Sequence, residues 1–310
     1  MPDLAIHTRD LTRDFGALRA VDGLSLDVPT GVIFGFLGPN GSGKTTTIRL
    51  LLGLLEPTAG VADVLGHDTR TDAGAIRERC GALLEHPGLY ERMTAQDNLD
   101  FYARVWRLSS VERQARVREL LTGLDLWERR REIVGAWSRG MKQKLAVART
   151  LLHRPALVFL DEPTAGLDPI AAAALREDLT ALARREGVTV FLTTHNLAEA
   201  EKLCDLVGVI NRGGLLAVGR PDELRSRAGS GRMEITGRGI DARIAALVHA
   251  QPAAASVELD DGKLTLRLRD GVDTAPVVAL LVHEGVAIDE VRKGSADLEE
   301  AFMTLVGGEA

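Results

Sequence analysis

The chain has 310 residues, of which 45% are hydrophobic, and a formal net charge of −6 at pH 7. This length favours two domains over one, and the apolar share is ample for packed cores. The acidic balance argues against a general nucleic-acid binder, which would carry an excess of basic residues, so we expect no nucleic-acid partner.

The sequence offers no segment that would secrete the chain or anchor it in a membrane. Its first ten residues, MPDLAIHTRD, lack the basic segment and the apolar run of a signal peptide. No stretch supplies the ~18 apolar residues that a membrane helix needs. Cys80 and Cys204 lie in apolar surroundings without metal-type spacing, which indicates reduced core thiols. We therefore expect a cytoplasmic protein that reaches a membrane only through a partner.

The first part of the chain combines strand patterns with a helical one. Residues 24–28 and 32–36 are predicted strands, residues 44–52 a helix, and residues 82–84 a further strand. Almost wholly apolar runs such as 32–36 are typical of strands buried on both faces of a parallel sheet. Strand–helix alternation of this kind predicts an α/β layered core.

Residues 88–154 depart from this alternation, because nearly all of them have helical patterns. One helix start is predicted at Thr94, with Asp97 three residues later, and another at Ser109 and Ser110. We therefore predict an all-helical insert within the α/β domain, called the helical insert below.

The alternation of strands and helices resumes after the helical insert. These elements complete the predicted α/β core. The predicted strands are 157–160, 188–193, 206–210 and 215–218, and the predicted helices are 171–185 and 197–204.

The pattern changes again at Gly229, Ser230 and Gly231, which have the composition of a linker. We therefore predict two domains, residues 1–225 and 226–310. In the second domain the order βαββαβ predicts a small α+β, ferredoxin-like fold, and no phosphate or metal motif falls within it. Its predicted elements are strand 233–236, helix 241–250, strand 256–260, a turn at Asp261-Gly262, strand 263–269, helix 275–284, strand 286–292 and a last helix, 297–306.

The segment GPNGSGKT matches the phosphate-loop pattern G-x-x-x-x-G-K-[ST] between a strand and a helix. Its glycines allow positive φ and let backbone N–H groups approach phosphate oxygens. Lys44 supplies a point charge for the β- and γ-phosphates, and the Thr45 hydroxyl is placed to ligate Mg²⁺. The residues predicted to bind ATP here are Gly38, Pro39, Asn40, Gly41, Ser42, Gly43, Lys44, Thr45 and Thr46.

Polar residues follow two of the predicted buried strands. LVFLDE brings Asp161 and Glu162 to the carboxyl end of a strand, where ligands of open α/β sheets bind. Asp161 would hold Mg²⁺ directly or through water, and Glu162 would orient or deprotonate the attacking water. His195 lies 34 residues after Asp161, a spacing that fits one helix and a neighbouring strand, so it can reach the γ-phosphate. Without the phosphate loop, solvated polar residues at strand ends would be the simpler interpretation.

Together these motifs resemble the nucleotide-binding subunit of an ABC transporter over residues 4 to about 222. The resemblance includes the phosphate loop, LVFLDE, the AGLD after it, His195, and WSRGMKQKL at the place of the family signature. It implies a P-loop NTPase core of α/β class with an antiparallel β subdomain and an inserted helical subdomain.

The resemblance also implies a site shared between two subunits. In the family, two subunits close head-to-tail, and each signature caps the γ-phosphate held by the other's phosphate loop. The corresponding signature residues are Ser138, Arg139, Gly140 and Met141, and Asp168 matches the loop beside the opposite site. Arg139 replaces the usual glycine, and Trp137 the usual leucine. The Arg139 cation could strengthen the cap or point to solvent, and the sequence does not choose.

Two further residues are assigned by the resemblance alone. Phe15 stands where the family places the aromatic that stacks on adenine, although a core residue at a strand end would look the same. Glu85 stands where the family has a glutamine that senses Mg²⁺ and the membrane partner. A carboxylate also binds Mg²⁺ and accepts from water, but it adds a negative charge.

The expected function is an ATPase subunit that dimerises around MgATP and powers a separate multi-span permease at the inner face of the cell membrane. GMKQKLAVARTLLHRP and the appended domain are similar to subunits of ABC-2-type exporters of drugs or lipids. One alternative is a mechanical clamp of the same class, but DNA clamps interpose hundreds of residues between phosphate loop and signature, where this chain has 94. Another is a generic P-loop enzyme, which would have no use for the signature.

Overall fold

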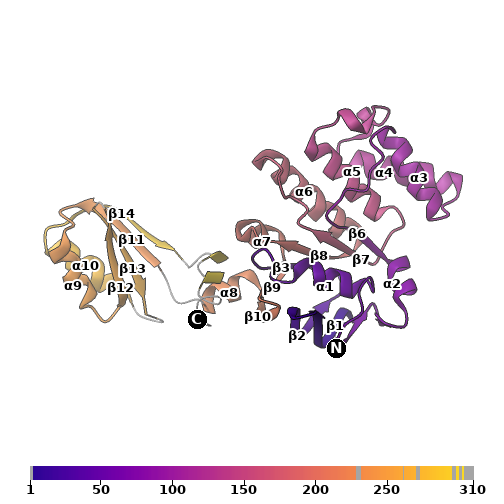
Figure 1. Cartoon of the computed structure of the whole chain (residues 1–310). Coiled ribbons are helices and arrows are strands. Elements are labelled where there is room, and N and C mark those ends of the chain that lie inside the picture. The colour runs from indigo at the N-terminus through magenta and orange to yellow at the C-terminus, as the bar shows by residue number, and fades with distance from the viewer. Residues whose placement is uncertain are drawn as a thin grey trace. The chain divides into compact units, whose positions relative to one another are not determined.

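The computed structural model describes residues 3–227, 232–260, 262–269, 273–294, 298–299 and 302–303. The chain divides into two compact units, Met1–Val218 and Gly219–Ala310 (Figure 1). The boundary predicted from the sequence lies seven residues later, and the predicted linker residues 229–231 lie outside the described residues.

A six-stranded sheet forms the centre of the first unit, in the order β10-β9-β3-β8-β7-β6. Every residue of β3, β7 and β8 is buried, which explains why each contains an apolar run without alternation, although β8 also buries three threonines. The β3–β8, β3–β9, β7–β8 and β6–β7 pairs are parallel, so the predicted α/β core is confirmed. The strands are β3 (Ile33–Leu37), β6 (Cys80–Leu83), β7 (Leu157–Asp161), β8 (Thr189–Thr194), β9 (Leu206–Asn211) and β10 (Gly214–Gly219).

Helices α1 (Lys44–Leu51), α6 (Pro169–Glu186) and α7 (Leu197–Leu203) follow strands of this sheet. Helix α6 begins two residues before its predicted start, because Asp168 caps it and Pro169 occupies its first turn. It ends at Gly187, whose φ of +64° is the left-handed conformation that stops helices.

An antiparallel sheet in the order β2-β1-β4-β5 adjoins this core. The sequence patterns predict only part of β2 and do not reveal β1, β4, β5 or the seven-residue helix α2 (Ala73–Arg79). Register shifts between β1 and β2 break the alternation that would have revealed a half-buried strand. The strands are β1 (Leu4–Phe15), β2 (Leu18–Pro29), β4 (Ala59–Val64) and β5 (His67–Asp68).

The helical insert contains α3 (Ala95–Val105), α4 (Ser110–Gly123), two short 3-10 turns and α5 (Arg139–Leu151). Both predicted starts are confirmed. The Thr94 side chain accepts a hydrogen bond from the Asp97 N–H, and Ser109 forms a capping box with Glu112.

Trp106, at the end of α3, stacks on the His153 ring with their centroids 3.8 Å apart. His153 also lies 3.1 Å from the Cys80 carbonyl oxygen, so it joins the helical insert to β6. Burial lowers the pKa of His153 to about 4; the hydrogen bond to the Cys80 carbonyl oxygen opposes this shift, and the nearby Arg116 cation adds to it. The folded protein therefore holds this imidazole neutral at pH values where an unfolded chain would protonate it.

We expect His153 to make stability fall on acidification. Its pKa is lower in the folded chain than the ordinary 6.5, so the unfolded chain binds more protons between these values. The free energy of unfolding therefore decreases as pH falls from about 6.5 to about 4, by about 3 kcal/mol over the whole interval. Thermal unfolding at pH 7 and pH 5 should show a smaller loss of Tm for His153→Gln than for the wild type. His86→Gln, at an exposed position, should keep the wild-type loss; equal losses in all three proteins would contradict this prediction.

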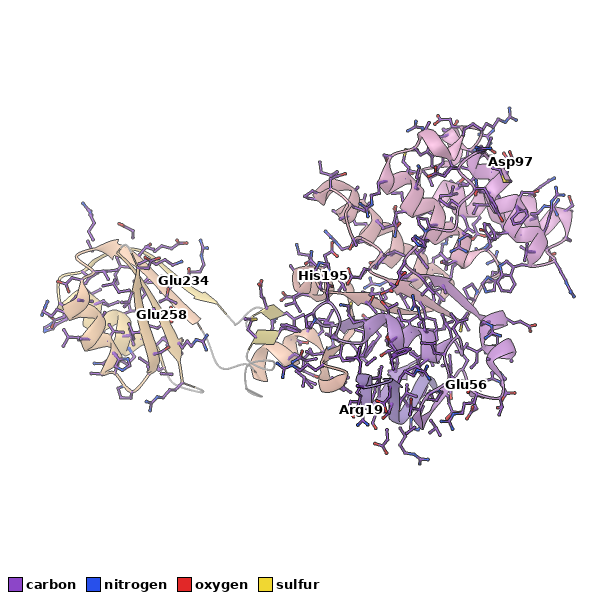
Figure 2. The ribbon with its side chains drawn as sticks, in the orientation of Figure 1. Arg19, Glu56, Asp97, His195, Glu234 and Glu258 are labelled. Carbon is purple, nitrogen blue, oxygen red and sulfur yellow. The ribbon has the colours of Figure 1, made fainter. Side chains whose placement is uncertain are left out.

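The second unit has the order β11, α9, β12, β13, α10, β14, which is the βαββαβ order that the sequence predicts. Its strands are antiparallel in the sheet order β12-β13-β11-β14. Met233 and Ile235 are buried on one face of the sheet, whereas Glu234 alternates with them on the other (Figure 2). The elements are α8 (Pro221–Arg227), β11 (Arg232–Arg238), α9 (Ala242–His249), β12 (Ala254–Asp260), β13 (Lys263–Leu268), α10 (Ala275–His283) and β14 (Ala287–Gly294).

The helix predicted over 297–306 and the turn residue Asp261 lie largely or wholly outside the described residues. Within the described ranges, no helix combines the length and the apolar character that a membrane span requires.

Candidate functional site

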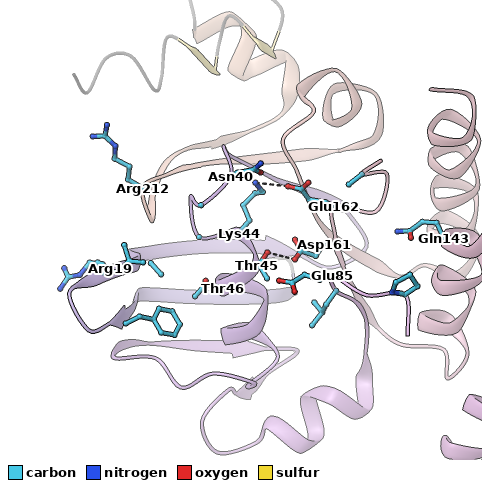
Figure 3. A pocket seen from close by; sticks show the side chains of 18 of the residues that line it. Arg19, Asn40, Lys44, Thr45, Thr46, Glu85, Gln143, Asp161, Glu162 and Arg212 are labelled. Atoms are coloured by element: carbon cyan, nitrogen blue, oxygen red, sulfur yellow. Dashed lines mark hydrogen bonds and ion pairs between the residues drawn. The ribbon is translucent and has the colours of Figure 1, made fainter. Parts of the chain in front are cut away.

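A pocket of about 850 Å³ opens at the carboxyl ends of β3 and β7 (Figure 3). The phosphate loop, the start of β2, the segment after β6 and the first turn of α5 contribute to its wall. Eleven of the residues predicted from the sequence line it: Phe15, Asn40, Gly41, Gly43, Lys44, Thr45, Thr46, Glu85, Arg139, Asp161 and Glu162.

The phosphate loop requires glycine at two positions. A Cβ on Gly38 would lie 2.4 Å from the Ile210 carbonyl oxygen. Gly43 has a φ of +104°, and a Cβ there would lie 2.3 Å from the Ala20 carbonyl oxygen. Because glycine has no Cβ, the loop backbone can lie this close to the Ile210 and Ala20 carbonyl oxygens. Ser42 is buried and does not line the pocket, nor do Gly38 and Pro39.

Lys44 is buried at the floor of the pocket, with 6% of its side chain exposed. Its ammonium donates to the carbonyl oxygens of Gly38, at 2.7 Å, and Pro39, at 3.2 Å. It also lies 3.3 Å from Glu162 Oε1 (Figure 3). The loop and β7 thus hold the cation in one place, so little side-chain entropy remains to be lost when an anion binds.

Asp161, the last residue of β7, lies between two hydroxyl groups. Thr45 Oγ1 donates to its Oδ2 at 2.7 Å (Figure 3), and Thr193 Oγ1 donates to its Oδ1 at 2.5 Å. The described residues contain no cluster of three or more metal-ligating side chains. Mg²⁺ needs no such cluster, because it is usually held by one or two protein oxygens, waters and substrate phosphates. The Thr45–Asp161 pair therefore fits Mg²⁺.

Glu162 directly follows β7 and has a φ of +47°, an uncommon backbone conformation for a non-glycine residue. Its N–H donates to the carbonyl oxygen of Thr193, at 3.1 Å, and to the Thr193 hydroxyl, at 3.0 Å. Its Oε2 lies 3.0 Å from Nδ1 of the half-exposed His195. The structure thus brings His195 to the edge of the site through Glu162, although His195 does not itself line the pocket.

Phe15 and Glu85 line two other sides of the pocket. Phe15, at the end of β1, is 44% exposed. The Arg13 guanidinium carbon lies 4.6 Å from the centroid of the Phe15 ring. Glu85 is exposed and forms an ion pair with Arg49 at 3.0 Å, which offsets its negative charge. The net charge at this side of the pocket is therefore less negative than the Glu85 carboxylate alone would make it.

The signature residues lie at the start of α5. Ser138 caps this helix, since its Oγ accepts from the Met141 N–H at 3.3 Å. Arg139 lines the pocket, whereas Ser138, Gly140 and Met141 do not. The Arg139 guanidinium lies over Gly166, where a Cβ would come within 2.3 Å of its Nη1. These contacts place the Arg139 side chain at the wall of its own chain's pocket.

Trp137 and Asp168 have structural partners of their own. Trp137 is buried and donates from its indole to Glu132 Oε2 at 3.1 Å. Asp168 is exposed, caps α6 through the N–H groups of Ile170 and Ala171, and does not line the pocket.

Comparison with known proteins identifies the architecture around this pocket. A family model described as "ABC transporter" matches residues 21–165. The daunorubicin resistance ATP-binding protein DrrA3 of Streptomyces coeruleorubidus is 36% identical over 308 residues, which cover 99% of this chain and 97% of that protein. The chain belongs to the ABC transporter family. The bacitracin transport ATP-binding protein BcrA of Bacillus licheniformis is 35% identical over 311 residues, covering 98% and 97% of the two chains.

Solved ABC proteins have a similar fold. The structure of cbiO1 from Clostridium perfringens, part of an ABC transporter complex, covers 72% of this chain and 91% of its own at a TM-score of 0.68 and 26% identity. A structure titled as the ATP-binding subunit of an ABC transporter covers 73% and 93% at a TM-score of 0.64 and 32% identity. The predicted fold class is confirmed.

Several residues of this ABC site were not predicted from the sequence. Lys142 and Gln143 follow Arg139 by three and four positions, so helical spacing alone could have placed them on the same face. Thr193 gave a weaker signal, as a polar residue at the end of a buried strand. Arg19 and Arg212 come from segments that only the tertiary structure brings to the pocket (Figure 3).

Proposed function

We propose that this chain is the ATP-binding and ATP-hydrolysing subunit of an ABC transporter and that it powers a separate membrane permease. The observation that carries this proposal is the convergence of Lys44, Thr45, Asp161 and Glu162 in one pocket of an ABC fold. Each of these side chains has a chemical task in phosphoryl transfer.

The first task is to hold the triphosphate. The N–H groups of the phosphate loop would donate to phosphate oxygens, and the buried Lys44 ammonium would pair with the β- and γ-phosphates. Thr45 and Asp161 would supply protein oxygens to Mg²⁺, which when bound neutralises phosphate charge. Phe15 would stack on the adenine, because its ring is half-exposed at the pocket wall.

The second task is to activate water. We assign Glu162 as the general base: its carboxylate accepts a proton from the attacking water, whose oxygen bonds to the γ-phosphorus. The bond from that phosphorus to the oxygen bridging to ADP then breaks. His195, at 3.0 Å from Glu162 Oε2, would orient this carboxylate and contact the γ-phosphate. The Glu162 N–H donates to both the carbonyl oxygen and the hydroxyl of Thr193, and these two hydrogen bonds would hold Glu162 in its strained conformation.

The third element is a second copy of the chain. Of the four signature residues only Arg139 lines the pocket of its own chain, and Ser138, Gly140 and Met141 would contact a nucleotide held by the other copy. A head-to-tail homodimer would bring the start of α5, with its unsatisfied helix-terminal N–H groups, to the γ-phosphate of the partner. Asp168 would then face the opposite site. Binding of two ATP molecules would close this dimer, and hydrolysis would open it.

We further infer that the transporter is an exporter. The relatives matched over nearly the whole chain are named for daunorubicin resistance and bacitracin transport. A separate multi-span permease of the ABC-2 type would hold this subunit at the inner face of the cell membrane. Cells that express the chain with a candidate permease should accumulate less drug than cells with the Glu162→Gln subunit. Equal accumulation would count against that permease and drug pair.

Replacing Lys44 tests the nucleotide site directly. Lys44→Ala removes the buried cation, so we expect the affinity for MgATP in isothermal titration calorimetry to fall by about 100-fold. Lys202→Ala, at an exposed position on α7, is the matched control and should bind as the wild type does. Undiminished binding by Lys44→Ala would remove this phosphate site.

A further inference from the structure

Arg13 makes an uncommon set of contacts next to the adenine position that we propose. It lies two residues before Phe15 in β1, on the other side of a register shift between Arg13 and Asp14. Its guanidinium carbon is 4.6 Å from the centroid of the Phe15 ring, close enough for a cation–π interaction. Phe15 lines the pocket, whereas Arg13 does not.

The Arg13 side chain is fixed at its far end. Its Nη1 donates to the Glu56 carbonyl oxygen at 2.8 Å, and its Nε is buried without a hydrogen-bond partner. The segment of Glu56 is itself tied to β1, because the Thr58 hydroxyl accepts from the Asp14 N–H at 3.0 Å. Arg13 thus spans from the chain before β4 to the Phe15 ring.

The charge of Arg13 is directed at the ring and not at a carboxylate. Among the described residues, no ion pair involves Arg13, whereas Arg19 on the next strand pairs with both Asp14 and Asp22. An arginine in protein remains charged at all relevant pH values. The hydrogen bond to Glu56 holds the Arg13 cation in place. The attraction between this cation and the π-face of Phe15 restricts the ring to the orientation in which that face meets the guanidinium.

We propose that Arg13 is a positioning residue for the base of the nucleotide. It holds Phe15 so that the other face of the ring is presented to the pocket as a platform for a purine. This inference rests on the proposed ATP site. It predicts that Arg13 contributes to base recognition and not to phosphate binding or to the chemical step.

The test compares ATP with inorganic tripolyphosphate, a probe that has phosphates but no base. Arg13→Gln should raise the Kd for MgATP and its KM by about 3- to 10-fold, with kcat within about twofold of the wild type. The inhibition constant of tripolyphosphate against the ATPase should stay within about twofold. Arg13→Lys, which keeps the charge but not the planar guanidinium, should be intermediate. Arg9→Gln, an exposed change on the same strand, is the control and should behave as the wild type.

A double-mutant cycle identifies the route of the effect. Phe15→Leu should weaken ATP binding, and Arg13→Gln should add nothing in the Phe15→Leu background. Additive effects, or a parallel loss of tripolyphosphate binding, would overturn the inference. The inference would also be overturned if Arg13→Gln left ATP affinity unchanged while Phe15→Leu lowered it; that result would leave the proposed function intact. If Phe15→Leu itself left ATP affinity unchanged, the base-stacking assignment would fail as well.

Discussion

Glu162→Gln is expected to lower the ATPase kcat by about 10²- to 10⁴-fold, because an amide cannot accept the proton of the attacking water. The replacement keeps the shape of the side chain and can still hydrogen-bond to His195, which lies 3.0 Å from it. It also removes the negative charge 3.3 Å from Lys44, so ATP binding should be retained. ATP-bound dimers should therefore accumulate, and light scattering should detect them in the presence of MgATP.

Phosphate release under steady-state conditions measures this effect. Glu177→Gln, at an exposed position on α6, is the matched control and should turn over as the wild type does. Wild-type turnover by Glu162→Gln would refute its assignment as the base. If Glu162→Gln lost turnover but stayed monomeric at saturating MgATP, the chemical role of Glu162 would stand and the proposed dimer would be contradicted.

A mixture of two inactive variants is expected to regain ATPase activity if the site is shared between subunits. Lys44→Ala disables the phosphate loop, and Ser138→Arg puts a bulky side chain on the signature. In a mixed dimer, one composite site keeps Lys44 from one subunit and Ser138 from the other. Random exchange makes half of the dimers mixed, each with one of its two sites intact, so we expect about a quarter of wild-type activity from this symmetric arrangement.

The control for this experiment is a mixture of Lys44→Ala with Glu162→Gln. Lys44 and Glu162 of one chain lie 3.3 Å apart, so they serve the same nucleotide, and neither site of this mixed dimer is intact. This mixture should stay inactive. Failure of the first mixture, or recovery by the control, would contradict a site completed by the partner's signature.

The core of the fold and the centre of the site could be predicted because their signals are local. The phosphate loop needs glycine where backbone groups come close, as at Gly38 and Gly43. The glycines therefore recur at a fixed spacing, which makes the motif recognisable in the sequence. The strands β3, β7 and β8 are buried on both faces, so each contains an apolar run. Helix α3 begins at the cap that the pattern at Thr94 indicates.

The parts that could not be predicted depend on contacts between distant segments. β1 has twelve residues, but its irregular register hides the alternation of a half-buried strand. The contact between Arg13 and Phe15 could not be predicted, because Arg13 is held by a hydrogen bond to Glu56 and the sequence does not show that Glu56 lies beside β1. The sequence does not set the direction of the Arg139 side chain, because this direction depends on Gly166, which belongs to the loop after β7.

The alignment of β7 beside β8 sets where the two carboxylates stand. Asp161 pairs with Thr193 in this parallel ladder, and the Thr193 hydroxyl contacts both the Asp161 carboxylate and the Glu162 N–H. Wholly apolar strands carry little information about register, since a slip by one residue exchanges one aliphatic side chain for another. Asp161 is the one charged residue of β7 and β8, and a slip that set it beside Leu192 would leave its buried carboxylate without the Thr193 hydroxyl. The same few atoms that organise the reaction thereby also penalise misaligned folding of the sheet.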